Sequence, residues 1–253
     1  EIATTYDFYI YSIIGANCSG GPKYQSINPL TGSATTNSCS GTGTYSIGTS
    51  GSNYISITAA LSNLALMGIQ DTVIFEIQSD YISENKVVFN SIGCNDSTHV
   101  LIIRPAANVV NDIVFYQPAS ASGYVLDFNK CLGVFIDGRP GGAGLEKKFI
   151  FRALNGSTIN FRNESNHINI SHCKIEGTPN SDVTGIIQIW KCNFLTLEKN
   201  DIGNPSYMAP ILINFANQNN SFVKIEDNNL FNFSSKAISI SNAYNGVVSN
   251  NSF

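Results

Sequence analysis

One pattern of apolar and polar positions recurs in the second half of the chain. An apolar, a polar and a second apolar residue are followed by a short polar stretch and a third apolar residue. Three complete copies occupy residues 168–175, 195–202 and 223–230, and their starts lie 27 and 28 residues apart. An incomplete copy occupies 248–253. Self-similarity at a period of this length is typical of a solenoid, in which each repeat stacks on its neighbours.

The apolar positions predict strands. They alternate with polar positions at the start of each copy, which is the two-residue period of a strand with one buried face. Further short apolar strands precede the copies, at 158–161, 186–190, 211–215 and 237–240. Similar strand-like segments occur upstream, at 72–77, 99–105, 124–128 and 132–138. We therefore predict an all-β fold, a right-handed single-stranded parallel β-helix.

A short helix is predicted before the first coil. Apolar residues fall at helical spacing there, at Ile57, Ala60, Leu61, Leu64 and Ala65. Ser56 or Thr58 can cap the start of this helix, and Gly68 can end it. We expect the helix at about 56–67 to cover the first coil, because an open end exposes apolar surface and unpaired strand edges.

The chain divides into two parts at about residue 43. Residues 44–253 form the predicted β-helix, whereas residues 1–43 are rich in Gly, Ser and Thr and predict an extended, irregular segment stapled by a disulfide. The last repeat is incomplete at Phe253, and no capping segment is recognisable there. We therefore expect the β-helix to continue beyond residue 253.

Asparagines occupy one slot of the repeat, five residues after its first apolar position. Cys173 fills this slot in the first copy, and Asn200, Asn228 and Asn251 fill it in the later ones. Asparagine amides at a corner can stack from coil to coil and satisfy the backbone groups of the turn. We interpret these asparagines as a structural ladder without a catalytic role.

Six cysteines favour disulfides over a metal site, since no close Cys or His pairs of the CxxC kind occur. Cys18 with Cys39 is the first predicted bond, and closing that loop would stabilise the fold by roughly 3 kcal/mol. Cys94 with Cys131 is a second candidate. Cys131 and Cys192 share a register, but two coils separate them by about 9.6 Å, which exceeds disulfide reach. No metal and no cofactor are predicted.

Composition narrows the function classes. Charged residues make up only 13% of the chain, and the net charge is −4. The 14 basic residues are scattered, so no basic stripe for nucleic acid exists. No apolar run approaches the ~18 residues that span a bilayer. Residues 1–11 also lack the basic region of a signal peptide.

Glu198 and Glu226 are the candidate catalytic residues. They fill the same slot of neighbouring copies, so a coil spacing of about 4.8 Å would separate them. Glycoside hydrolysis requires two carboxylates on one face, and a calcium site could also use them. Solvated corner residues that happen to be acidic are the simpler interpretation of this pair.

Other residues with chemical potential have simpler interpretations. His99, His167 and His172 lack evident partners and predict ordinary hydrogen bonds, and Trp190 ends an apolar run, which favours packing or a corner position. The glycine-rich segment 138–144 lacks the context of a phosphate-binding loop and is interpreted as an exposed excursion.

The opening of the predicted β-helix resembles a known group of proteins. The segments 43–48 (GTYSIG), 54–61 and 73–77 (VIFEI) are similar to the start of right-handed parallel β-helix proteins that Bacteroidota export by type IX secretion. The resemblance covers roughly residues 42–253. It implies a secreted or surface-anchored, adhesin-like protein, and says little about activity. The C-terminal sorting domain usual in such cargo is absent from these residues.

The same resemblance implies two glycosylation candidates. The O-glycosylation motif of these bacteria, Asp, then Ser or Thr, then an apolar residue or Thr, matches at Thr72 and Ser97.

Two functions remain open. The first is a non-catalytic structural or adhesin-like module at the cell surface or outside the cell, with a surface glycan, a surface protein or the secretion machinery as partner. The alternative is a polysaccharide-binding or polysaccharide-degrading β-helix, a lyase or hydrolase that uses Glu198 and Glu226.

Overall fold

The computed structural model describes residues 5–11, 13–14, 23–24, 29–35, 38–121, 123–179, 183–216 and 219–253. The chain forms two compact units, Glu1–Cys39 and Ser40–Phe253, so the division falls slightly before the predicted boundary at residue 43.

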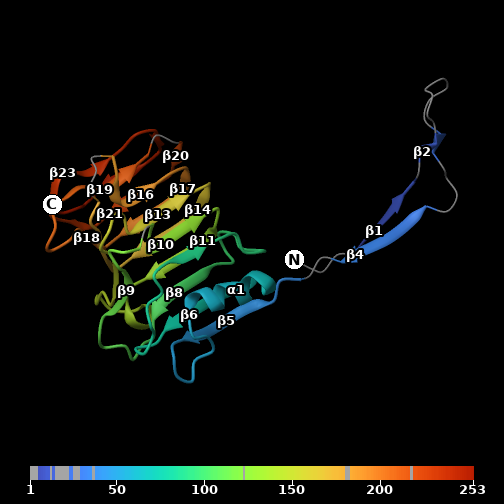
Figure 1. Ribbon diagram of the computed structural model, residues 1–253, viewed down its shortest axis with the longest axis horizontal. Coiled ribbons are helices and arrows are strands. Elements are labelled where there is room, and N and C mark those ends of the chain that lie inside the picture. The colour runs from blue at the N-terminus through green and yellow to red at the C-terminus, as the bar shows by residue number, and fades with distance from the viewer. Residues whose placement is uncertain are drawn as a thin grey trace. The chain divides into compact units, whose positions relative to one another are not determined.

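The first unit consists of nested antiparallel strand pairs (Figure 1). β1 (Thr5–Ile10) pairs with β4 (Leu30–Thr35), and β2 (Ile13–Ile14) pairs with β3 (Lys23–Tyr24). The segment was predicted to be extended and irregular; these residues are extended, but they pair as regular antiparallel strands. Tyr6, Phe8 and Tyr9 give β1 a strong strand preference, which the surrounding Gly and Ser content masks in the sequence.

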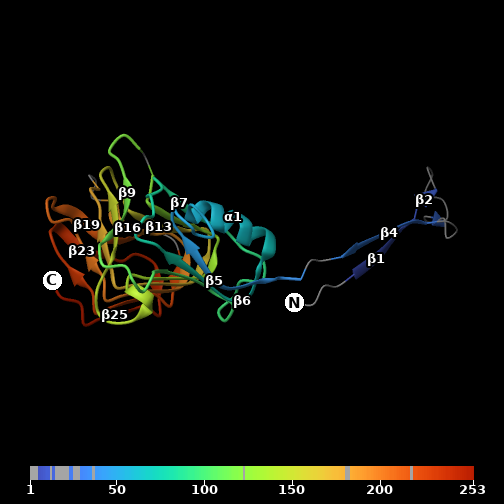
Figure 2. The same ribbon diagram turned by 90° about the horizontal axis from the view of Figure 1, so that it is seen from below.

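The second unit is a parallel β-helix, which confirms the predicted fold (Figures 1 and 2). Its first wall, the long sheet, contains β5 (Gly41–Ile47), β6 (Ile69–Ile77), β8 (Leu101–Pro105), β11 (Leu132–Asp137), β14 (Ser165–Ser171), β17 (Cys192–Glu198), β20 (Asn220–Ser221), β21 (Lys224–Glu226), β24 (Ala243–Tyr244) and β25 (Val247–Ser249).

Two further walls complete each coil. The six-strand sheet contains β7 (Val87–Phe89), β10 (Leu126–Asn129), β13 (Ile159–Arg162), β16 (Gly185–Ile189), β19 (Ala209–Phe215) and β23 (Phe233–Ser239). The five-strand sheet contains β9 (Ile113–Gln117), β12 (Phe149–Ala153), β15 (Cys173–Glu176), β18 (Asp201–Ile202) and β22 (Asn229–Leu230). A short 3₁₀ helix, Pro140–Gly142, lies in the excursion between β11 and β12.

The sequence repeat corresponds to one coil of this β-helix. Ile168 pairs with Leu195, and Ile170 pairs with Leu197, so the recurring pattern marks each long-sheet strand and the five-strand-sheet strand after it. The apolar segment before each copy forms the six-strand sheet. Inward side chains then stack from coil to coil, as Phe89, Phe128 and Phe161 do with ring centroids 4.7 and 4.8 Å apart.

The helix α1 (Ile57–Met67) covers the first coil, as predicted (Figure 2). The Ser56 side chain accepts a hydrogen bond from the Ala59 amide at 3.1 Å, and Gly68 ends the helix at a φ of 66°. Ile57, Ala60 and Leu64 are its buried residues. These three positions bury the apolar surface of the coil end.

The disulfide differs from both predicted pairings. Cys39 is bonded to Cys94, whereas Cys131, Cys173 and Cys192 are buried free thiols. Cys18 lies outside the described residues. Parallel pairing explains the correction: Gly41 pairs with Ile69, whose amide donates to the Gly93 carbonyl at 2.9 Å. Register between coils, which loop length alone does not reveal, brings the two ends of this bond together.

The asparagines form a continuous ladder at the corner between the long and five-strand sheets. The Asn228 Oδ1 accepts from the Asn200 amide at 2.9 Å, and the Asn251 Oδ1 accepts from the Asn228 amide at 3.0 Å. Each Nδ2 group also donates to a main-chain carbonyl of the preceding coil. We call Asn200, Asn228 and Asn251 the Asn ladder; it satisfies buried turn groups that water cannot reach.

Candidate binding face on the long sheet

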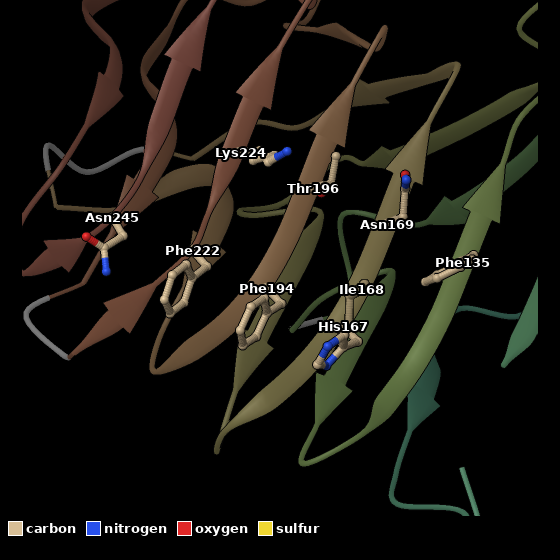
Figure 3. Close-up of a pocket in the computed structure, with 9 residues that line it drawn as sticks. All are labelled: Phe135, His167, Ile168, Asn169, Phe194, Thr196, Phe222, Lys224 and Asn245. Atoms are coloured by element: carbon tan, nitrogen blue, oxygen red, sulfur yellow. The ribbon is translucent and has the colours of Figure 1, made fainter. Parts of the chain in front are cut away.

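Aromatic rings stack along the outside of the long sheet (Figure 3). The His167 and Phe194 ring centroids lie 4.7 Å apart with an interplanar angle of 15°, and the Phe194 and Phe222 centroids lie 4.6 Å apart at 6°. This spacing matches the ~4.8 Å between coils. We call these three residues the aromatic stack.

A left-handed kink in each strand places the aromatic stack outside. The φ angles of His167, Phe194 and Phe222 are 50°, 48° and 54°, and Asn245 continues the row at 52°. In β17 the kink lets two consecutive side chains, Asn193 and Phe194, lie outside between the buried Cys192 and Leu195. Such φ values are uncommon for bulky residues and cost about 1–3 kcal/mol each. The stack therefore persists against a local backbone cost.

The rings present their edges to solvent. Parallel stacking covers the ring faces, and Phe194 and Phe222 remain 43% and 44% exposed. Beside the stack lies a cleft of about 340 Å³, whose other walls are Phe135, Ile168, Asn169, Thr196, Lys224 and Asn245. Figure 3 shows these side chains coming from successive strands of the long sheet. The cleft thus runs across several coils.

Two polar atoms at the cleft lack partners. The His167 Nδ1 and the Asn169 Oδ1 are buried without a hydrogen bond to any described residue. Leaving a buried polar atom unpaired costs about 1–3 kcal/mol. A donor or a water in the cleft would remove that cost.

Glu198 and Glu226 pair in register on neighbouring strands, where the sequence places them. Their carboxylates accept hydrogen bonds, from the Asn169 Nδ2 at 3.3 Å and from the Ser249 Oγ at 3.1 Å. They lie two residues beyond Thr196 and Lys224, however, and neither lines the cleft. The in-register pair expected from the sequence is therefore present, but it lies outside this cleft.

One close ion pair lies in the neighbourhood of these two carboxylates. Arg139 donates from Nε and Nη2 to Asp137 at 2.9 and 2.7 Å, and this hydrogen bonding raises the pKa of Arg139. His172 is buried beside them, and burial lowers its pKa, aided by the positive charge of Arg139. A neutral His172 explains how an imidazole tolerates this buried corner.

The remaining predicted sites lie elsewhere. Ser97 is exposed in a turn where Asp96 accepts from the backbone amides of Thr98 and His99, which holds the pKa of Asp96 well below its usual range. Thr72 is half-buried in β6. Trp190 lies at an exposed corner and does not pack in the core.

Among the described residues, no group of three or more His, Cys, Asp or Glu side chains is placed to hold a metal ion. Nor does that part of the chain contain a helix long and apolar enough to cross a bilayer.

The aromatic stack was missed at the sequence level although its signal is present. The residue immediately before each copy of the repeat is His167, Phe194 or Phe222. Comparison with known proteins adds no identity, because no protein-family model, no curated protein and no solved structure matches this chain.

Proposed function

We propose that the chain is a non-catalytic, adhesin-like β-helix module of the cell surface or the extracellular space, and that it binds an extended glycan along the long sheet. The aromatic stack with its adjoining cleft carries this proposal. An extended polymer repeats its contacts along its length, and this face repeats an aromatic edge in consecutive coils. The exposed ring edges carry partial positive charge and can contact the hydroxyl oxygens of a glycan.

Two further observations support the location. The Cys39–Cys94 disulfide is of the kind that persists in oxidising compartments. The surface polarity rests on uncharged Asn, Ser and Thr, with 13% charged residues overall. Such a composition favours hydrogen bonding to neutral hydroxyl groups over binding to phosphate backbones.

The test is glycan-array binding of the whole chain and of a Phe194→Asn/Phe222→Asn double variant. Asparagine suits these kinks, because Asn245 already adopts the same conformation in the next coil. We expect at least a tenfold loss of affinity in the double variant. Tyr116→Asn, which removes an exposed aromatic from the five-strand sheet, is the matched control and should bind normally. Wild-type protein that binds no uncharged glycan, or a double variant that binds uncharged glycans fully, would overturn the proposal.

The alternative activity, polysaccharide cleavage, rests on Glu198 and Glu226 alone. A hydrolase needs two carboxyl groups about 5–9.5 Å apart that flank the scissile bond. Both residues project from one face in adjacent coils, outside the cleft. We expect no reducing-sugar release from any polysaccharide that the chain binds. Turnover that disappears in Glu226→Gln would instead establish the catalytic function.

A further inference from the structure

A second cleft, of about 600 Å³, opens on the outside of the six-strand sheet. Lys86, Arg162 and Lys191 line it together with Trp190, and Asp127 is its single acidic residue among those described. We call this site the cationic cleft. Its volume lies within the range typical of small-ligand sites.

A buried carboxylate organises the cationic side chains. Asp127, whose side chain is only 2% exposed, accepts from the Arg162 Nε and Nη2 at 2.9 and 3.1 Å, from the Lys86 Nζ at 2.9 Å and from the Asn160 Nδ2 at 3.0 Å. Burial raises the pKa of Asp127, but these hydrogen bonds outweigh it and leave the pKa below its ordinary value. Asp127 therefore stays ionised and fixes both cations.

The charges of this cluster do not cancel. One carboxylate faces two cations, and Lys191 adds a third, which is paired at 2.6 Å with Glu164 on the exposed surface. Exposed ion pairs are weak, so Lys191 is available to a competing anion. Arg162 uses two of its three nitrogens on Asp127, and guanidinium offers five donors in all. Three of these donors are therefore not used by Asp127.

Trp190 supplies an apolar surface next to these charges. It follows β16 in register with Arg162, since Phe161 pairs with Ile189. Its side chain is 44% exposed. In the next coil the same position holds Ala216, whose amide donates to the Ile189 carbonyl at 3.0 Å. Among these three neighbouring coils, this position therefore holds an aromatic side chain only at Trp190, which lines the cleft next to Arg162.

We propose that the cationic cleft binds a carboxylate-bearing sugar ring, with the carboxylate against Arg162 and Lys191 and the apolar face of the ring against Trp190. The planar guanidinium fork matches a carboxylate, and aromatic rings pack against the C–H face of a pyranose. Asp127 acts as a positioning residue that holds Arg162. This site lies on another sheet from the aromatic stack, so it can be tested independently of the function proposed above.

The single tryptophan of the chain provides a local readout. Trp190 fluorescence of the whole protein would be titrated with trigalacturonic acid and with its methyl ester, which keeps the rings and removes the charge. We expect saturable quenching by the acid and at least tenfold weaker binding of the ester. Salt at 0.5 M should weaken the binding of the acid. Equal responses to acid and ester, or no response to the acid, would refute the site.

Variants separate this site from the long sheet. Arg162→Gln and Lys191→Gln should each weaken binding of the acid at least fivefold. Lys191 is exposed and its loss leaves the Asp127 cluster intact, so this variant remains informative if Arg162→Gln is unstable. Lys224→Gln removes one positive charge from the first cleft and should bind normally. Binding that survives Lys191→Gln, or that Lys224→Gln or Phe194→Asn/Phe222→Asn abolishes, would place the acid elsewhere and overturn the inference.

Discussion

The two ends of the β-helix differ in how they bury one and the same row of side chains. At the first coil this row holds Tyr45 and Phe75: Phe75 is buried, and the half-buried Tyr45 packs against the core with the Tyr54 ring, just before α1, at a centroid distance of 5.8 Å. At the last described coil, Val248 pairs with Ile225 and continues its row, yet Ile225 is fully buried and Val248 is 47% exposed. Two branched apolar side chains of the same row therefore contribute differently to the free energy of unfolding, depending on whether another layer covers them.

The disulfide at the covered end gives the largest expected effect. Cys39→Ser/Cys94→Ser should lower the free energy of unfolding by about 4 kcal/mol, because a loop of this size gains much chain entropy when it is opened. Denaturant unfolding with and without reductant measures this loss.

The response of the double variant to reductant is the control for that experiment, because this variant keeps the buried free thiols. Burial raises the pKa of Cys131 to about 12, so its thiol stays protonated and unreactive in the native state. Reductant should therefore leave the double variant unchanged. A reductant effect of equal size in both proteins would show that the loss does not come from the Cys39–Cys94 bond.

The cover itself is tested by Leu64→Ala in α1. Leu64 is buried against the coil, and its truncation should cost about 3 kcal/mol through lost burial and a cavity. Leu66→Ala is the matched control, since Leu66 is 83% exposed on the same helix and should change stability by less than about 0.5 kcal/mol. Equal effects of the two variants in denaturant unfolding would mean that α1 does not seal the coil.

The Asn ladder compares the interior with the last coil. Asn228→Ala should lower the free energy of unfolding by about 2 kcal/mol, because it leaves the buried Asn200 amide and the Leu197 carbonyl without their hydrogen bonds to this side chain. Asn251→Ala removes the same kinds of bond at a half-buried position, where water can replace them, and should cost less. Amide hydrogen exchange at Asn200 and Asn228 reports each loss directly. A larger cost for Asn251→Ala would reverse the comparison.

Much of the fold follows from the sequence because each coil repeats one local rule. The alternation at Ile168 and Ile170, the Asn slot and the cap at Ser56 are short-range signals, and each specifies a strand, a corner or a helix start. The Cys39–Cys94 bond depends on how coils stack over long sequence separations. Cysteine spacing within a loop therefore pointed to the wrong partners.

The candidate sites were harder to predict from the sequence, for a related reason. Phe194 and Trp190 are large apolar residues, and a pattern of burial assigns such residues to the core. Only the left-handed φ at Phe194 and the corner after β16 turn them outward. Likewise, Lys86, Asp127 and Arg162 belong to three different coils, and register alone brings them together.

The smallest effect is expected for Val248→Thr, which replaces one methyl group by a hydroxyl. At an exposed site this exchange should change the free energy of unfolding by less than about 0.5 kcal/mol. Ile225→Thr, one coil earlier in the same row, buries an unpartnered hydroxyl and loses apolar volume, and should cost about 3 kcal/mol. Denaturant unfolding of both variants measures the difference between a covered and an uncovered coil. A cost for Val248→Thr close to that of Ile225→Thr would mean that the last coil is covered in solution, and a second copy of the chain would then be sought by light scattering.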